Sequence, residues 1–156
     1  MIPSAFGAAL KYLVPHDVEI LTERTIESFC TFDKLKTRLP KTILQKRVDF
    51  VLRKKERLFF IEFKTNLNFN DLAAAAVEMA IVKHCLGKKS IRTNSLHFWP
   101  WLADVDGLKA VNELVQSPID DIWVFCKMGK NGLPLFDSSA VADFQKSVAH
   151  WAKQKK

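Results

Sequence analysis

Glycine, proline and cysteine are scarce in this chain of 156 residues, which contains five, six and three of them respectively. So little glycine and proline excludes a collagen-like or low-complexity chain, and we find no internal repeat. The cysteines, Cys30, Cys85 and Cys126, are odd in number and lie far apart. Their spacing argues against a disulfide scaffold and a zinc knuckle, and it fits a reducing compartment.

Long apolar runs are also absent, and no segment approaches the length of a membrane-spanning helix. The segment from Met1 to Val14 carries only Lys11 as a charge, so it lacks the basic region of a signal peptide. No glycine-rich phosphate loop is present, which argues against the use of nucleoside triphosphates. We therefore expect a soluble, cytoplasmic protein that does not enter a membrane.

Apolar bulk and positive charge are what the chain does contain. Hydrophobic residues make up 48% of it and include twelve Phe and four Trp, which is enough for one core and a single domain over residues 1–156. The formal net charge is +7, and such a surface attracts polyanions, of which nucleic acid is the commonest and acidic membranes the second. Solubility alone would also explain the charge.

Periodicity and turn residues predict the order of elements along the chain. A charged link from Lys54 to Arg57 joins two β-rich runs and predicts a hairpin. The other expected helices and strands are a helix over Ser4–Val14, a second over Asp17–Leu39, a third over Leu72–Leu86 capped from Asn68–Asp71, a strand at a sheet edge or a packed loop over Ser95–Trp101, a short helix over Gly107–Gln116, a buried strand over Asp120–Lys127 and a helix over Ser139–Lys153. This order predicts an α/β sandwich with a mixed sheet.

The hairpin is the most informative segment, because burial selects its register. If Arg53 pairs with Leu58, one face of the hairpin is entirely apolar, since it carries Val48, Phe50, Leu52, Phe59, Ile61 and Phe63. A slip of one residue would place acidic side chains in the core. In the apolar register Asp49 lies directly opposite Glu62, and Lys64 lies beside Glu62 on the same face.

Two carboxylates opposed across neighbouring strands are unfavourable unless something compensates their charge. A divalent cation would do so, and hard oxygen ligands suit Mg²⁺, for which Mn²⁺ can substitute. Asp49, Glu62 and the backbone carbonyl of Phe63 are the expected ligands. Such a cation lowers the pKa of a bound water, which Lys64 would orient or deprotonate, so the pattern predicts cleavage of a phosphodiester.

The pattern of Asp49 followed by Glu62-Phe63-Lys64 at the end of a second apolar strand resembles the PD-(D/E)XK nuclease superfamily, which includes many type II restriction endonucleases. Val48 stands where the name-giving Pro would be. The resemblance implies a restriction-endonuclease-like, three-layer α/β/α core with a mixed β-sheet. It assigns metal binding to the two acids and assistance of the nucleophile to Lys64. It also implies an acid from a helix before the hairpin, for which Glu19, Glu23 and Glu27 are candidates, and a first core strand, for which Thr42–Lys46 is a candidate.

The resulting hypothesis is an Mg²⁺-dependent endodeoxyribonuclease, of restriction type, acting on double-stranded DNA. Cleavage of both strands needs two sites, so a homodimer or a partner recognition subunit is expected. Candidate DNA contacts near the site are Arg47, Thr65, Asn66 and Asn68. The alternatives are a structure-selective repair or junction nuclease, a basic nucleic-acid-binding module without catalysis, a protein-interaction domain, and an ordinary surface ion pair between Glu62 and Lys64.

Two further residue types have a plain structural interpretation. The four histidines, His16, His84, His97 and His150, are scattered and none has a cysteine at ligand spacing, so we expect packing or surface roles. Trp99 and Trp101 could stack on bases, although packing in the core or at a subunit contact is the favoured interpretation.

Overall fold

The computed structural model describes residues 2–29, 41–86, 91–99 and 105–154. Its elements in chain order are α1 (Ile2–Leu13), β1 (Glu19–Thr25), the 3-10 helix η1 (Ile26–Phe29), α2 (Lys41–Leu44), β2 (Arg47–Lys54), β3 (Arg57–Asn66), α3 (Phe69–Leu86), β4 (Ile91–Trp99), α4 (Val105–Leu114), β5 (Asp121–Val124), β6 (Cys126–Met128), β7 (Pro134–Phe136) and α5 (Ser138–Lys153).

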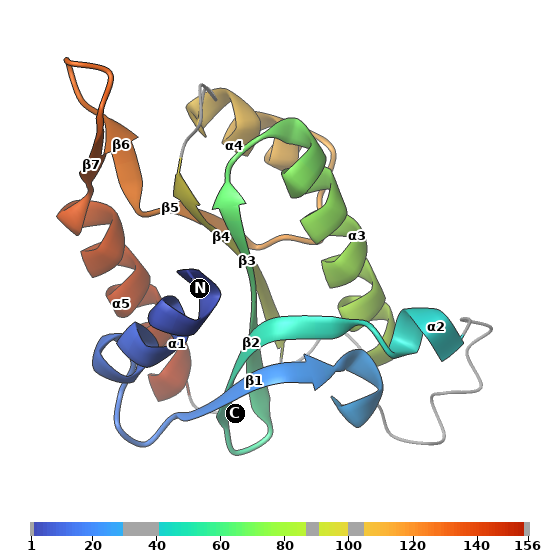
Figure 1. The fold of residues 1–156 in the computed structure, drawn as a ribbon. Coiled ribbons are helices and arrows are strands. Elements are labelled where there is room, and N and C mark those ends of the chain that lie inside the picture. Colours follow the sequence, from blue (N-terminus) through green and yellow to red (C-terminus); the bar gives the residue numbers. More distant parts are fainter. Residues whose placement is uncertain (1, 30–40, 87–90, 100–104, 155–156) are drawn as a thin grey trace.

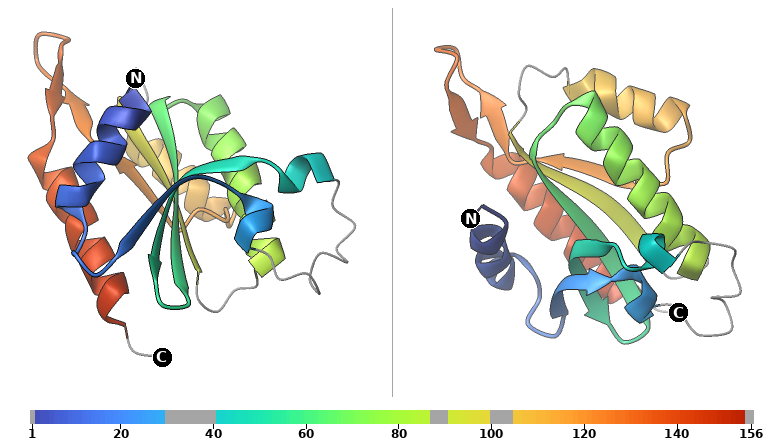
Figure 2. Two further views of the ribbon diagram at one scale, coloured as in Figure 1. Left: turned by 60° about the horizontal axis from the view of Figure 1, so that its bottom comes forward. Right: turned by 45° about the vertical axis from the view of Figure 1, so that its right-hand side comes forward.

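One mixed sheet of five strands, in the order β1-β2-β3-β4-β5, forms the middle layer (Figure 1). The first three strands pair antiparallel, whereas β3, β4 and β5 run parallel, with α3 and α4 as the connections. Helices α1 and α5 cover one face, and α3 and α4 cover the other (Figure 2). The predicted mixed sheet between helices is therefore confirmed.

The β2–β3 hairpin forms in the predicted register, with Arg53 opposite Leu58. The connection between the strands contains no glycine, and Lys55 adopts the positive φ (57°) that so tight a turn needs. Strand β3 is buried on both faces, as a central strand between two helical layers must be.

A core lies on each face of the sheet. On the α1 and α5 face, aromatic rings dominate: Phe6 of α1 stacks on Phe63 at 5.0 Å, and Phe59 meets Trp151 of α5 edge-on at 5.4 Å. On the opposite face, Val51 and Phe60 pack against the small and aliphatic side chains of α3. Ala75, which is fully buried, allows α3 to lie close to the sheet.

One predicted member of the apolar hairpin face was wrong. Val48 is buried with Val51 and Phe60 on the α3 side, not with Phe50 and Leu52. The β2–β3 ladder ends at Phe50 and Ile61, and β2 then curves away from β3 (Figure 1). The change of direction turns Val48 toward the other core.

The predicted helix over Asp17–Leu39 was also wrong. Residues 19–25 form β1, which pairs with β2 from Glu19 opposite Arg53 to Thr25 opposite Arg47, and η1 follows it. Residues 30–40 lie outside the described part. The first strand of the sheet is thus β1 and not Thr42–Lys46, since most of that segment belongs to α2 and the turn after it. Pairing with β2 outweighs the local helical pattern in this segment.

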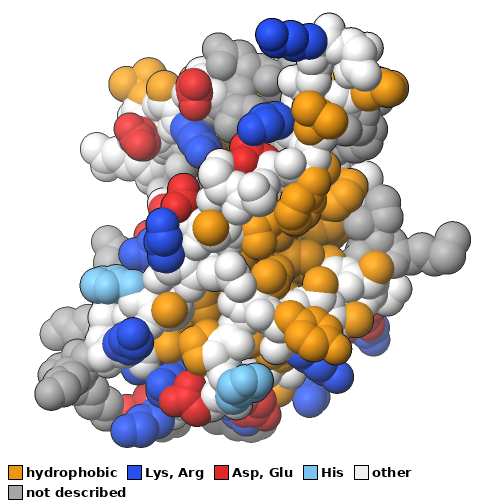
Figure 3. Space-filling view, turned by 90° about the vertical axis from the view of Figure 1, so that its left-hand side faces the viewer, with side chains coloured by type: hydrophobic (Ala, Val, Ile, Leu, Met, Phe, Trp, Pro, Cys, Tyr) orange, Lys and Arg blue, Asp and Glu red, His pale blue; other side chains and the backbone are white. Residues whose placement is uncertain are grey.

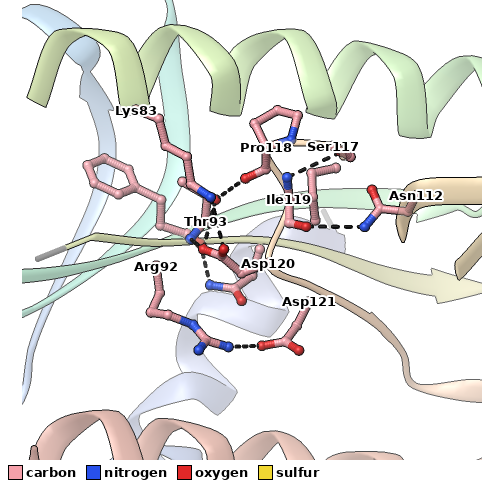
Figure 4. Close-up of polar contacts among 11 residues, drawn as sticks. Lys83, Arg92, Thr93, Asn112, Ser117, Pro118, Ile119, Asp120 and Asp121 are labelled. Atoms are coloured by element: carbon pink, nitrogen blue, oxygen red, sulfur yellow. Dashed lines mark hydrogen bonds and ion pairs between the residues drawn. The ribbon is translucent and has the colours of Figure 1, made fainter. Parts of the chain in front are cut away.

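The strand at residues 91–99 lies between β3 and β5, so it is an inner strand and not a sheet edge, while β5 ends the sheet. The segment before β5 is fixed to β4 by side chains (Figure 4). Asp120 accepts a hydrogen bond from the backbone N of Thr93 at 2.8 Å and contacts Lys83 of α3 at 2.9 Å. Arg92 pairs with Asp121 beside it. These contacts stabilise the edge strand and involve none of the predicted site residues.

The β6–β7 hairpin stands apart from the main sheet and exposes apolar side chains, among them Leu133, Leu135 and Phe136. Next to it is an apolar hollow of about 400 Å³, lined by Phe6, Leu13, Phe125 and Val141 among others. Figure 3 shows a concentration of apolar side chains on the side of the molecule that carries α1 and α5. Among the helices described, none has both the length and the apolarity needed to cross a membrane.

Candidate active site

Strands β2 and β3 separate at Asp49, and this separation creates the site. Backbone pairing between β2 and β3 is recorded from Lys54–Arg57 as far as Phe50–Ile61. Beyond that point Oδ2 of Asp49 accepts the backbone N–H of Phe63 at 2.9 Å. The carboxylate thus occupies the position where a strand carbonyl would otherwise accept this hydrogen bond. Asp49 is close enough to Glu62 for its charge to raise the pKa of Glu62, although the strand ladder ends one residue before the predicted pairing of the two acids.

Glu62 is buried in the middle of the sheet, with only 5% of its surface exposed. Its Oε1 receives a hydrogen bond from Nζ of Lys64 at 2.7 Å. Its Oε2 is buried and has no hydrogen-bond donor among the residues that the structure describes. A buried acceptor without a donor is costly and calls for a ligand or a proton.

The pKa values of the site follow from burial and from the proximity of like charges. Burial, and then the negative charge of Asp49, raise the pKa of Glu62 to about 8 against the hydrogen bond from Lys64. Burial also raises the pKa of Asp49, although the N–H of Phe63 opposes it. For Lys64, burial lowers the pKa, but the contact with Glu62 and the surrounding carboxylates outweigh burial and raise it. Without a cation, the site therefore holds an extra proton near neutral pH.

A third acid, Glu78 of α3, was missed by the sequence reasoning. Its Oε1 pairs with Nζ of Lys46 at 2.9 Å, and its Oε2 is buried, with no donor in the described part of the chain. Its charge raises the pKa of both Asp49 and Glu62, so it lies close enough to act on the site. The signal was present in the sequence, because Glu78 is the one acid in the middle of an otherwise apolar, alanine-rich helix.

The candidate acids before the hairpin have different surroundings. Glu19 pairs with Arg53 at the far end of β1, and Glu27 belongs to η1. Glu23 alone lines a groove together with Asp49, and its charge raises the pKa of Asp49. Its place on a strand departs from the expected helix.

The four residues predicted to contact DNA have mixed surroundings. Thr65 is exposed near the end of β3, and exposed Arg47 pairs with Glu23 at 3.3 Å. Asn68 serves as the cap of α3, since its Oδ1 accepts the N–H of Asp71 at 2.9 Å and its amide donates to that carboxylate. The carbonyl of Asn66 faces Nδ1 of His97 at 2.8 Å. The DNA-binding role of these residues stays a prediction.

His97 is fully buried in β4 next to Lys64 and has a packing role, as expected. Its Nδ1 donates to the carbonyl of Asn66, which leaves Nε2 to accept from the hydroxyl of Ser95 at 2.7 Å. Burial lowers its pKa to about 4, so the ring is neutral at physiological pH. Trp99 ends β4, whereas Trp101 lies outside the described residues.

The oxygen ligands at this site fit a hard divalent cation that takes only a few of its ligands from the protein. Two carboxylates and a nearby backbone carbonyl are ligands that Mg²⁺ accepts, and Mg²⁺ fills its remaining positions with water. The unpartnered Oε2 of Glu62 is the atom that most needs such a partner. Within the described ranges, no group of three or more His, Cys, Asp or Glu side chains is arranged so that it could hold a metal ion. Coordination by the carbonyl of Phe63 stays a prediction.

No family model, curated protein or solved structure matches this chain.

Proposed function

We propose that this chain is a metal-dependent endodeoxyribonuclease of the PD-(D/E)XK type, with a restriction-endonuclease-like core. One observation carries the proposal: the buried carboxylate of Glu62 has an oxygen without a donor, next to a second carboxylate and in contact with a lysine. A surface ion pair would not need burial of this depth. The sheet has two antiparallel pairings, β1–β2 and β2–β3, followed by two parallel ones, β3–β4 and β4–β5. This mixed sheet agrees with the core that the resemblance implies and supports the same proposal.

In this proposal Asp49 and Glu62 bind the cation, and the N–H of Phe63 holds Asp49 in place. A Mg²⁺ or Mn²⁺ ion held by these two residues would supply Lewis acidity toward a phosphate oxygen. Glu62 would release its proton to solvent on becoming a ligand, because its carboxylate would then have a positive partner. Nζ of Lys64, held 2.7 Å from Glu62, would position the attacking water and stabilise the charge that grows on the phosphate.

The substrate in this proposal is DNA, since the net charge of +7 favours a polyanion. If the enzyme cuts both strands of the DNA, the proposal includes a homodimer, because two active sites are then needed. The test is the incubation of supercoiled plasmid with the purified chain and Mg²⁺, with EDTA as the metal control. Lys64→Ala should abolish cleavage, whereas Lys146→Ala, an exposed lysine on α5, should leave it unchanged.

Each outcome assigns a function. Metal-dependent cleavage into discrete bands supports a restriction enzyme, and cleavage confined to branched or nicked DNA supports the repair alternative. DNA binding that never leads to cleavage under Mg²⁺ or Mn²⁺ contradicts the enzyme and leaves the binding module.

A further inference from the structure

A groove of about 520 Å³ lies between α1 and the first two strands, and Asp49 is one of its lining residues. Gly7 and Ala8 of α1 line it on one side, and Thr22 and Glu23 of β1 and Phe50 of β2 line it on the other. The groove therefore opens directly beside one of the two carboxylates of the proposed active site. Its volume is in the range of pockets that hold a small organic ligand.

Small side chains on α1 keep this groove open. Helix α1 approaches β2 so closely at Gly7 that an added Cβ would lie 3.0 Å from Cε1 of Phe50. One position later, Ala8 is exposed and contributes only a methyl group to the wall. Helix α1 thus lies tightly against β2 at Gly7. Beside this contact, the small side chain of Ala8 leaves a space that a larger side chain would fill.

The backbone at Glu23 is in an unusual conformation at the same place. Its φ is 48°, in the left-handed region that disfavours glutamate, while its neighbours Thr22 and Arg24 pair regularly with Phe50 and Val48. Such conformations persist only where the surroundings fix them, and they are frequent at functional sites. Here the kink places Glu23 in the groove, beside Asp49.

We propose that this groove binds one unpaired nucleoside of the substrate strand, next to the phosphate that is cleaved at Asp49. This inference rests on the proposed nuclease function. The apolar side chains of Ala8 and Ile20 in the wall suit a sugar and base, and exposed Thr22 lines the same groove as a polar side chain. The ammonium group of Lys11, which also lines the groove, suits an adjacent phosphate.

The shape of the groove selects an unpaired nucleoside. Stacked base pairs of a duplex present only their edges to a protein, and α1 forms a wall on one side of this groove. A nucleotide that leaves the stack can insert its base and sugar into the groove. The free-energy cost of unstacking is smallest where the strand is already unpaired. The substrate class is therefore DNA with an unpaired nucleotide at the cleavage position, such as a flap or a fork.

The test compares binding of two fluorescent DNAs of the same sequence, a duplex with a single-stranded flap and a fully paired duplex. Binding is measured by anisotropy in the Lys64→Ala background with Mg²⁺, so that cleavage does not interfere. Ala8→Leu fills the groove, and Ala110→Leu on an exposed position of α4 is the matched control. Circular dichroism checks that both variants fold.

We expect the flap DNA to bind at least about tenfold more tightly than the duplex, since only the flap offers an unpaired base that can be buried in the groove. Ala8→Leu should remove that preference without weakening duplex binding, and Ala110→Leu should retain it. Equal affinity for both DNAs, or an unchanged preference in Ala8→Leu, would overturn the groove assignment, while plasmid cleavage by the unsubstituted chain would keep the nuclease proposal. Absence of both binding and cleavage would overturn both.

Discussion

The raised pKa of Glu62 makes the stability of the cation-free protein depend on pH in a defined direction. Its carboxyl has a pKa of about 8 when folded, against 4.5 as the ordinary value. Between pH 4.5 and pH 8, Glu62 therefore keeps its proton in the folded state and has lost it in the unfolded state. Protonation stabilises the fold fully below pH 4.5, and this contribution is lost as the pH rises toward 8.

The size of the effect follows from the width of this window. At 1.36 kcal/mol per pKa unit, the shift corresponds to at most about 5 kcal/mol of unfolding free energy between pH 4.5 and pH 8. The raised pKa of Asp49 contributes with the same sign. The lowered pKa of His97 acts in the opposite direction between pH 4 and pH 6.5, because the unfolded chain holds a proton there that the buried ring does not. Asp17 and Asp137, whose pKa values are lowered by their hydrogen bonds, act below pH 4 and so outside this window.

The assay is urea unfolding in EDTA at several pH values between 5 and 8. Above pH 6.5, where His97 no longer contributes, we expect the unfolding free energy of the unsubstituted chain to fall by about 1–2 kcal/mol up to pH 8, and Mg²⁺ to restore it at pH 8 but not at pH 5. Glu62→Gln should largely remove this fall, because the amide cannot ionise, whereas Glu113→Gln on α4 should leave it unchanged. The reasoning is refuted if Glu62→Gln loses stability with pH as steeply as the unsubstituted chain.

Three further predictions concern residues around the site. Glu78→Gln should weaken Mg²⁺ binding by a few-fold in calorimetry, since it removes a negative charge near the site; unchanged binding would make Glu78 only the partner of Lys46. Phe60→Ala should lower the unfolding free energy by about 3–5 kcal/mol in urea, because this ring is fully buried against α3; a loss under 1 kcal/mol would contradict that packing. If the predicted homodimer uses the apolar hollow beside β7, Phe136→Asp should halve the mass seen by light scattering and Leu114→Asp on α4 should not; a dimer that survives Phe136→Asp does not use this surface.

The hairpin and the site at its end could be predicted from the sequence because both depend on short-range patterns. Alternating apolar residues on the two strands allow only one register that buries them, and that register alone places Asp49 opposite Glu62. The same reasoning failed at Val48, since alternation assumes a straight strand and β2 curves where its ladder with β3 ends.

Long-range contacts account for what the sequence could not reveal. Asp17 offers a helix cap, and Val18, Leu21 and Phe29 are spaced for a helical stripe, yet pairing with β2 makes residues 19–25 a strand. Glu78 lies far from Asp49 in sequence, and only the packing of α3 on the sheet brings its charge near the site. The groove at Glu23 likewise needs α1 and β1 to be placed against β2.

Titration calorimetry with Mg²⁺ at pH 8 is the most direct measurement of whether Asp49 and Glu62 share a cation. We predict that the unsubstituted chain binds the ion and that Asp49→Asn and Glu62→Gln each weaken binding by at least about tenfold. Asp143→Asn, at an exposed side chain of α5, should leave binding unchanged. No detectable binding by the unsubstituted chain, or equal affinity in all four proteins, with Mn²⁺ giving the same result, would contradict a cation site at the end of this hairpin.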